Sequence, residues 1–166
     1  MLVLAIDPGN VMSAWVLYDS ENHTIRGHDK QDNDILVKRI RGDDWPDEAR
    51  PDQLAIEMIA CYGMPVGKTV FDTCVWIGRF IEAWAGGPHR LVYRSDVKMH
   101  LCHSMRAKDP NVRQALIDRF GRPGTKRDRG ITYGIAGDEW AALGVAVTFA
   151  ETATLFEAAQ GEGAKA

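Results

Sequence analysis

The sequence predicts a single α/β domain, because an opening group of apolar strands is followed by strands that alternate with amphipathic helices. The chain has 166 residues, of which 45% are hydrophobic. This is enough for one well-packed core and too short for two ordinary domains. We expect the domain to span residues 1–159, with residues 160–166 as a disordered tail.

The first three strands are predicted by apolar runs and polar breaks. Residues 2–6 are five consecutive apolar residues, typical of a strand that is covered on both faces of its sheet. Pro8-Gly9-Asn10 then turns the chain, and residues 13–18 and 23–28 read as two further strands joined by a polar hairpin loop. The opening is therefore expected to be an antiparallel meander.

The rest of the chain alternates between helices and strands. A short helix at 34–41 and a polar loop at 42–51 precede a strand at 54–56. Apolar residues recur at helical spacing from 66 to 85, and Gly86-Gly87-Pro88 ends that helix. A strand at 91–93, a helix at 96–103 with Ser95 as its N-cap, and a helix at 112–120 follow. Residues 122–134 read as a mobile basic loop, and the last helix runs from 137 to about 159.

Charge is distributed unevenly along the chain. The formal net charge is −3, yet residues 89–129 contain 11 Lys or Arg and 4 Asp or Glu. That segment is expected to attract phosphate groups, and acids elsewhere are available to bind metal ions. A solvated basic face that balances an acidic face is the alternative interpretation.

Cysteine content and hydropathy indicate the compartment. The three cysteines have no paired spacing, which favours free thiols over disulfides. The chain has no apolar run of membrane-spanning length, and its opening apolar run is too short for a signal peptide. We therefore expect a cytoplasmic protein that does not bind membranes.

Three acids from distant segments are candidates for one metal site. Asp7 and Glu57 each end an apolar strand, and Asp138 is predicted in the first turn of the last helix, where the helix dipole favours a negative side chain. Carboxylates suit Mg²⁺ and Mn²⁺, and strand ends hold them rigidly. Considered alone, each acid is more simply explained as a strand terminator or a helix cap.

The motifs around these acids resemble one known family. Ala5-Ile6-Asp7-Pro8-Gly9, then Ala55-Ile56-Glu57, then Gly137-Asp138-Glu139-Trp140-Ala141-Ala142-Leu143 have the order and spacing of the RuvC family of Holliday-junction resolvases, especially its compact bacteriophage branch. The resemblance spans most of the chain. It implies an RNase H-like nuclease domain, with a central mixed five-stranded sheet flanked by helices on both faces. It also implies a homodimer that works in a bacterial or phage-infected cell.

The resemblance assigns Asp7, Glu57 and Asp138 to metal-ligand and catalytic positions. It implies two ions per site, with Mg²⁺ expected and Mn²⁺ as the alternative. Family members usually have a fourth ligand three residues after the third, and here that position is Ala141. Glu139 is rotated by about 100° from Asp138 on a regular helix. It can replace that ligand only if the first turn of the helix is irregular.

The resemblance also suggests DNA-binding residues. Lys98 and Lys108 lie where similar proteins carry lysines that touch the scissile phosphate, and we expect a catalytic role for Lys108. Tyr62 lies where similar enzymes stack an aromatic ring on unpaired bases; packing on the core is the alternative. Lys68 begins the long helix, and that helix is apolar enough to contribute to a two-fold dimer interface. The predicted DNA-binding set is Tyr62, Lys68, Lys98, Arg106, Lys108, Lys126, Arg127 and Arg129.

The favoured function is a structure-selective endodeoxyribonuclease. It would resolve four-way DNA junctions by metal-dependent phosphodiester hydrolysis and leave 5′-phosphate and 3′-hydroxyl ends. One alternative is a less selective nuclease for flaps and replication forks. Another is a junction-binding protein without catalytic activity, which Ala141 suggests. An ATP-binding phosphotransferase also opens with strand-Asp-x-Gly but needs two lobes and about twice this length, so no nucleotide cofactor is expected.

Overall fold

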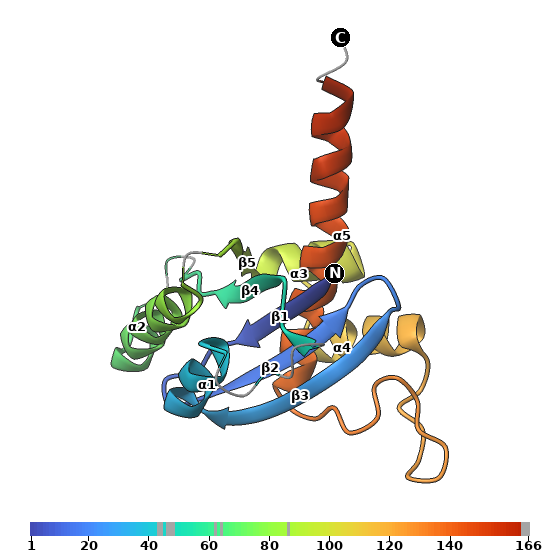
Figure 1. Cartoon of the computed structure of the whole chain (residues 1–166), viewed down its shortest axis with the longest axis horizontal. Coiled ribbons are helices and arrows are strands. Elements are labelled where there is room, and N and C mark those ends of the chain that lie inside the picture. Colours follow the sequence, from blue (N-terminus) through green and yellow to red (C-terminus); the bar gives the residue numbers. More distant parts are fainter. Residues whose placement is uncertain (43–44, 46–48, 62, 64, 86, 164–166) are drawn as a thin grey trace.

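The computed structural model describes residues 1–42, 45, 49–61, 63, 65–85 and 87–163, with side chains up to Ala153. Within these residues the fold is a mixed five-stranded sheet with the strand order β3-β2-β1-β4-β5 (Figure 1). The strands are β1 (Leu2–Asp7), β2 (Met12–Asp19), β3 (Thr24–Asp32), β4 (Gln53–Met58) and β5 (His89–Tyr93). The first three form the predicted antiparallel meander, whereas β4 lies parallel to β1 and β5 parallel to β4.

Helices cover both faces of the sheet, as predicted. Side chains alternate across a strand, so Val3 and Ala5 of β1 belong to one core cluster while Leu4 and Ile6 belong to the other. The helices α1 (Asn33–Ile40) and α2 (Lys68–Ala83) pack on the face of Leu4 and Ile6. The opposite face carries α3 (Arg94–Cys102), α4 (Asp109–Phe120) and α5 (Glu139–Gly163). A sheet covered on both faces explains why β1 is apolar at consecutive positions.

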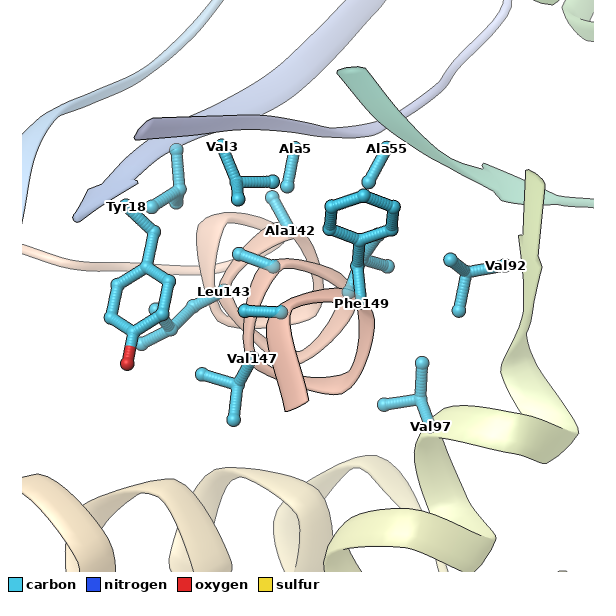
Figure 2. Packing of buried hydrophobic residues seen from close by; sticks show 14 of the residues in the cluster. Val3, Ala5, Tyr18, Ala55, Val92, Val97, Ala142, Leu143, Val147 and Phe149 are labelled. Atoms are coloured by element: carbon cyan, nitrogen blue, oxygen red, sulfur yellow. The ribbon is translucent and has the colours of Figure 1, made fainter. Parts of the chain in front are cut away.

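The helix α5 packs closely against the centre of the sheet. Figure 2 shows its Ala142 facing Ala5 of β1, with Ala55 of β4 alongside, and all three residues are fully buried. Small side chains allow the helix axis to approach the strands. Gly144 has the same effect toward α3, because a Cβ there would lie 3.1 Å from Cγ1 of Val97. This packing fixes the first turn of α5 over the ends of β1 and β4.

Some element boundaries differ from the prediction. The helix α3 begins at Arg94, so Ser95 lies inside the helix and is not its N-cap. Asp96 takes part in the capping, since its Oδ2 accepts a hydrogen bond from the Tyr93 amide at 3.3 Å. The helix α5 begins at Glu139 and continues to Gly163, past the predicted end at about residue 159. Asp138 therefore precedes the helix instead of lying in its first turn.

The basic segment 122–134 forms a closed turn. Gly124 and Arg129 form an isolated antiparallel bridge, and the Gly130 amide donates to the Pro123 carbonyl at 2.8 Å. Gly124 has a φ of 78°, a conformation that glycine adopts without steric cost. The segment thus presents its charged side chains from a defined turn. Among the described residues, no helix has the length and apolar character needed to cross a membrane.

Candidate active site

Asp7 and Glu57 lie side by side because of the parallel register between β1 and β4. Ile6 pairs with Ile56, so the two acids follow at the same level of neighbouring strands, which lie about 4.8 Å apart. Ala5 and Ala55, two residues earlier, face α5. Alternation along the strands therefore directs both carboxylates to the side of the sheet that α5 covers.

A buried hydrogen-bond network fixes the turn that follows Asp7. The Gly9 amide donates to Ser13 Oγ at 3.1 Å, and the Gly9 carbonyl accepts from Asn33 Nδ2 at 2.9 Å. Ser13 Oγ in turn donates to Asn33 Oδ1 at 2.6 Å, and both polar side chains are almost completely buried. Buried polar groups that are fully hydrogen-bonded make a backbone rigid. The network therefore holds the end of β1, and Asp7 with it, in a defined position.

Asp138 reaches the same place from the start of α5. Its carbonyl accepts the first hydrogen bonds of the helix, from the amides of Ala141 at 2.9 Å and Ala142 at 3.1 Å. Its carboxylate Oδ2 lies 2.6 Å from Nζ of Lys30, which projects from β3. Gly137 has a φ of 51°, and this left-handed residue turns the chain into the helix.

A cleft of about 540 Å³ joins the three predicted acids. Ala141, at the position where a fourth carboxylate was expected, also lines it and presents a methyl group. Trp140 forms part of the wall, and the guanidinium carbon of Arg113 lies over its ring, 5.2 Å from the ring centroid. The lining residues are Asp7, Glu57, Arg94, Asp109, Pro110, Val112, Arg113, Gly137, Asp138, Trp140 and Ala141.

The surroundings of Asp7 and Glu57 shift the pKa values of both acids. Burial, helped by the neighbouring charges of Glu57 and Asp138, raises the pKa of Asp7 to about 7. Burial also raises the pKa of Glu57, although the Arg94 guanidinium opposes this effect. Burial and other carboxylates disfavour the charged form of such an acid. A bound cation would stabilise that charged form.

Three charged residues of the cleft, Arg94, Asp109 and Arg113, were not predicted as site residues. Arg94 Nη1 lies 3.0 Å from Glu57 Oε2, and its Nη2 lies 2.6 Å from Asp109 Oδ1. Arg94 directly follows β5, much as Asp7 is the last residue of β1 and Glu57 the penultimate residue of β4, and Asp109 lies in the first turn of α4. The strand-end rule that identified the acids would also have identified Arg94, had it been applied to basic residues.

The donor chemistry of the cleft fits a hard divalent cation. Asp7, Glu57 and Asp138 offer only carboxylate oxygens, which are the ligands that Mg²⁺ and Mn²⁺ prefer. Within the described part of the chain, no three acid, histidine or cysteine side chains are arranged to hold a metal ion as they stand. The cationic groups of Lys30 and Arg94 engage Asp138 and Glu57 instead.

Glu139 has a different role from the one considered for it. Its Oε2 accepts a hydrogen bond from the Ala136 amide at 2.7 Å and lies 3.2 Å from Nδ1 of His28. The side chain is mostly buried, and Glu139 is not among the residues that line the cleft. Its contacts with the Ala136 amide and His28 hold the Glu139 carboxylate outside the cleft that Asp138 lines. The hypothesis of Glu139 as a replacement ligand has no support in this arrangement.

The predicted DNA-binding residues are spread around the cleft. Lys98 lines a smaller hollow with Arg94, and its charge acts on Glu57. Lys108 precedes α4, next to the cleft residue Asp109, and its side chain is exposed. Tyr62 lies outside the described residues. The other predicted contacts are exposed: Lys68 at the start of α2, Arg106 after α3, and Lys126, Arg127 and Arg129 in the turn at 122–134.

The sheet order and the two helical layers define an RNase H-like domain. Among solved structures, the chain is similar to RuvC of Thermus thermophilus, with a TM-score of 0.72, 19% identity, and coverage of 93% of this chain and 96% of that chain. It is also similar to the T. thermophilus RuvC in complex with a Holliday junction substrate, with a TM-score of 0.69, 18% identity and the same coverage. No protein-family model and no curated protein sequence matches the chain. The likeness at this identity is one of fold.

Proposed function

We propose that this protein is a nuclease that resolves four-way DNA junctions by metal-dependent hydrolysis of phosphodiester bonds, leaving 5′-phosphate and 3′-hydroxyl ends. The observation that carries the proposal is the convergence of Asp7, Glu57 and Asp138 on one cleft of an RNase H-like fold. The similar fold of T. thermophilus RuvC, which has been seen with a Holliday junction substrate, supports the choice of substrate. The assignment to the bacteriophage branch rests on motif order and chain length and stays a prediction.

The chain's own residues divide the work at this site. Asp7, Glu57 and Asp138 would hold Mg²⁺ or Mn²⁺, with two ions per site as the expectation. When bound, the ions would supply Lewis acidity and lower the pKa of a coordinated water. The Ser13 and Asn33 network keeps Asp7 in place, and the α5 packing keeps Asp138 opposite the strand ends. Fixed ligands reduce the reorganisation that accompanies the reaction.

The basic residues around the cleft would bind the DNA backbone. Lys98 shares a hollow with the cleft residue Arg94, and Lys108 directly precedes the cleft residue Asp109, so both are candidates to contact the phosphates beside the cleaved bond. The turn at 122–134 directly precedes the residues that lead to Asp138, and Lys126, Arg127 and Arg129 are exposed on it. Cations at these positions offset the repulsion between a phosphodiester and the acids.

Cleavage of labelled DNA by wild type and by Asp7→Asn tests the proposal. The wild type is expected to cut a four-way junction in Mg²⁺ and to be inactive in EDTA. Asp7→Asn is expected to lose at least about 1,000-fold in single-turnover rate while still binding the junction in Ca²⁺, because a ligand and a charge are removed from the site. Asp118→Asn on the exposed surface of α4 is a matched control. Normal cleavage by Asp7→Asn would disprove the assignment of the site.

The substrate class is tested with flap, fork, four-way and linear duplexes of one sequence. Preferential cutting of the four-way junction supports a resolvase. Comparable cutting of flaps and forks supports the less selective nuclease, and equal cutting of linear duplex contradicts selectivity for branched DNA. Junction binding without cleavage by the wild type would favour the inactive binding protein.

A homodimer through α2 is part of the proposal. Phe71 and Val75 lie one turn apart on this helix, and each side chain is more than 60% exposed, at 62% and 63%. Gly78 continues the same side of the helix, where an added Cβ would meet nothing within 4 Å. Apolar side chains that are this exposed are typical of a protein interface. Two cleavage sites related by a two-fold axis would suit a junction with two strands to cut.

The dimer is tested by sedimentation of wild type and of a Phe71→Glu/Val75→Glu double variant. The wild type is expected to sediment as a dimer, and the double variant as a folded monomer with an unchanged circular dichroism spectrum. The charged side chains would be desolvated in a dimer, which costs several kcal/mol. A dimeric double variant would place the interface elsewhere.

A further inference from the structure

Arg94 is held between two carboxylates inside the acidic cleft. Its Nη1 contacts Glu57 and its Nη2 contacts Asp109, at 3.0 and 2.6 Å. The Arg94 side chain is 25% exposed, so the guanidinium is partly shielded from water and still open to the cleft. Arg94 begins α3 directly after β5, and β5 pairs with the strand that carries Glu57. The sheet therefore fixes the position of the Arg94 backbone relative to Glu57.

The two contacts give the guanidinium a defined orientation and leave hydrogen-bond donors available. Arginine has five N–H donors in a planar fork. The ion pair with Glu57 uses Nη1, and the ion pair with Asp109 uses Nη2. The remaining donors suit the oxygens of a phosphate, which the guanidinium group binds with good geometry. Arg94 also lines the adjoining hollow with Lys98, so the cations continue from the cleft along the surface.

The charge of the cleft explains why a cation is needed here. Four carboxylates line it, those of Asp7, Glu57, Asp109 and Asp138, and each repels a phosphodiester. Arg94 carries a positive charge in direct contact with one of the three predicted metal ligands, Glu57. A DNA phosphate that approaches Glu57 therefore comes within reach of Arg94.

From this geometry we infer that Arg94 is a further catalytic residue, which binds a non-bridging oxygen of the scissile phosphodiester and stabilises the charge of the transition state. Asp109 is its positioning residue. The inference rests on the proposed nuclease function and assigns a residue to that reaction. The competing interpretation is that Asp109 is itself a metal ligand in place of the carboxylate missing at Ala141. That role requires Arg94 to leave its position between Asp109 and Glu57.

Arg94→Gln, Arg94→Lys and Asp109→Asn test the inference. Arg90→Gln on β5 and Asp118→Asn on α4 are matched controls, since both residues are exposed and neither lines the cleft. Single-turnover cleavage of a four-way junction is measured at saturating Mg²⁺. Mn²⁺ affinity is measured by calorimetry without DNA, and junction affinity in Ca²⁺. Circular dichroism checks that each variant is folded.

Arg94→Gln is expected to lower the cleavage rate by about 100-fold or more while junction affinity falls less than about tenfold, because the contact strengthens in the transition state. Its Mn²⁺ affinity is expected to stay the same or to rise, since a competing cation is removed. Arg94→Lys retains the charge without the planar fork, and about a tenfold loss of rate is expected. Asp109→Asn is expected to slow cleavage without weakening Mn²⁺ binding.

Three results would overturn the inference without disproving the proposed nuclease. Arg94→Gln with wild-type cleavage, while Asp7→Asn is inactive, would reject the role of Arg94 and leave the proposed nuclease intact. Weaker Mn²⁺ binding by Arg94→Gln, with full recovery of the rate at high Mn²⁺, would mean that Arg94 only positions Glu57. Weaker Mn²⁺ binding by Asp109→Asn would make Asp109 a metal ligand. If the wild type cuts no DNA, the proposed function itself fails, and this inference with it.

Discussion

The inner and outer sides of the acidic cleft hold their carboxylates in different ways. On the inner side, the Glu57 side chain is 15% exposed and pairs with the partly buried Arg94. On the outer side, the Asp138 side chain is 55% exposed and pairs with Lys30, which is 46% exposed. Charges interact more strongly when water is excluded. The inner side therefore carries most of the electrostatic cost of the metal-free site, and the outer side is screened and free to adjust.

This difference follows from the elements that carry the acids. Asp7 and Glu57 lie at or next to the ends of parallel strands in the middle of the sheet, on the face that α5 packs against. Asp138 precedes a helix and projects from its end, where solvent has access. An incoming metal ion would relieve repulsion at the inner acids and would compete with Lys30 at the outer acid.

The pH dependence of stability tests the inner side. Without metal, the Asp7 pKa is raised from 3.8 to about 7, so between these values the folded protein binds more protons than the unfolded chain. Folding stability must then fall as pH rises through this range. We expect this acid to lower the free energy of unfolding by on the order of 2–4 kcal/mol between pH 4 and pH 7. Asp7→Asn should be less sensitive to pH and more stable than wild type at pH 8.

Urea unfolding of both proteins in EDTA, at several pH values, measures this effect. The difference between wild type and variant isolates Asp7 from the other titrating groups, provided that the urea dependence stays unchanged. Adding Mg²⁺ at pH 8 should stabilise the wild type more than the variant. Parallel curves for the two proteins from pH 4 to pH 8 would show that Asp7 is not strained in the metal-free state.

Restoring the missing carboxylate is the next test. Ala141 lines the cleft one helical turn from Asp138, so Ala141→Asp would place a carboxylate beside the outer acid. We expect Mn²⁺ affinity to rise roughly tenfold, because the charge and number of oxygen ligands set the affinity of such sites. Ala141→Asn has a similar size without the charge and is the matched control. Equal affinities of the two variants in calorimetry would mean that position 141 does not reach the ion.

The sequence predicted which acids meet in the cleft better than it predicted the ion pairs that these acids form. Apolar strands that end in acids predicted that Asp7 and Glu57 would meet, because the ends of neighbouring parallel strands lie together. The resemblance to the RuvC family pointed to position 141, and Ala141 lines the cleft. The contacts of Lys30 with Asp138 and of Arg94 with Glu57 join residues 108 and 37 positions apart. No local pattern encodes such pairs, because they depend on how the layers pack.

Lys30→Gln tests the outer side and is expected to have the smallest effect. An exposed ion pair contributes less than about 1 kcal/mol, since water screens the charges and two flexible side chains must be ordered. The free energy of unfolding should therefore barely change, in contrast with Asp7→Asn. Releasing Asp138 should raise Mn²⁺ affinity a few-fold at low ionic strength and less at high ionic strength, where Lys30 is already screened. A large loss of stability would show that Lys30 holds the start of α5 in place, so that the outer side is as rigid as the inner one.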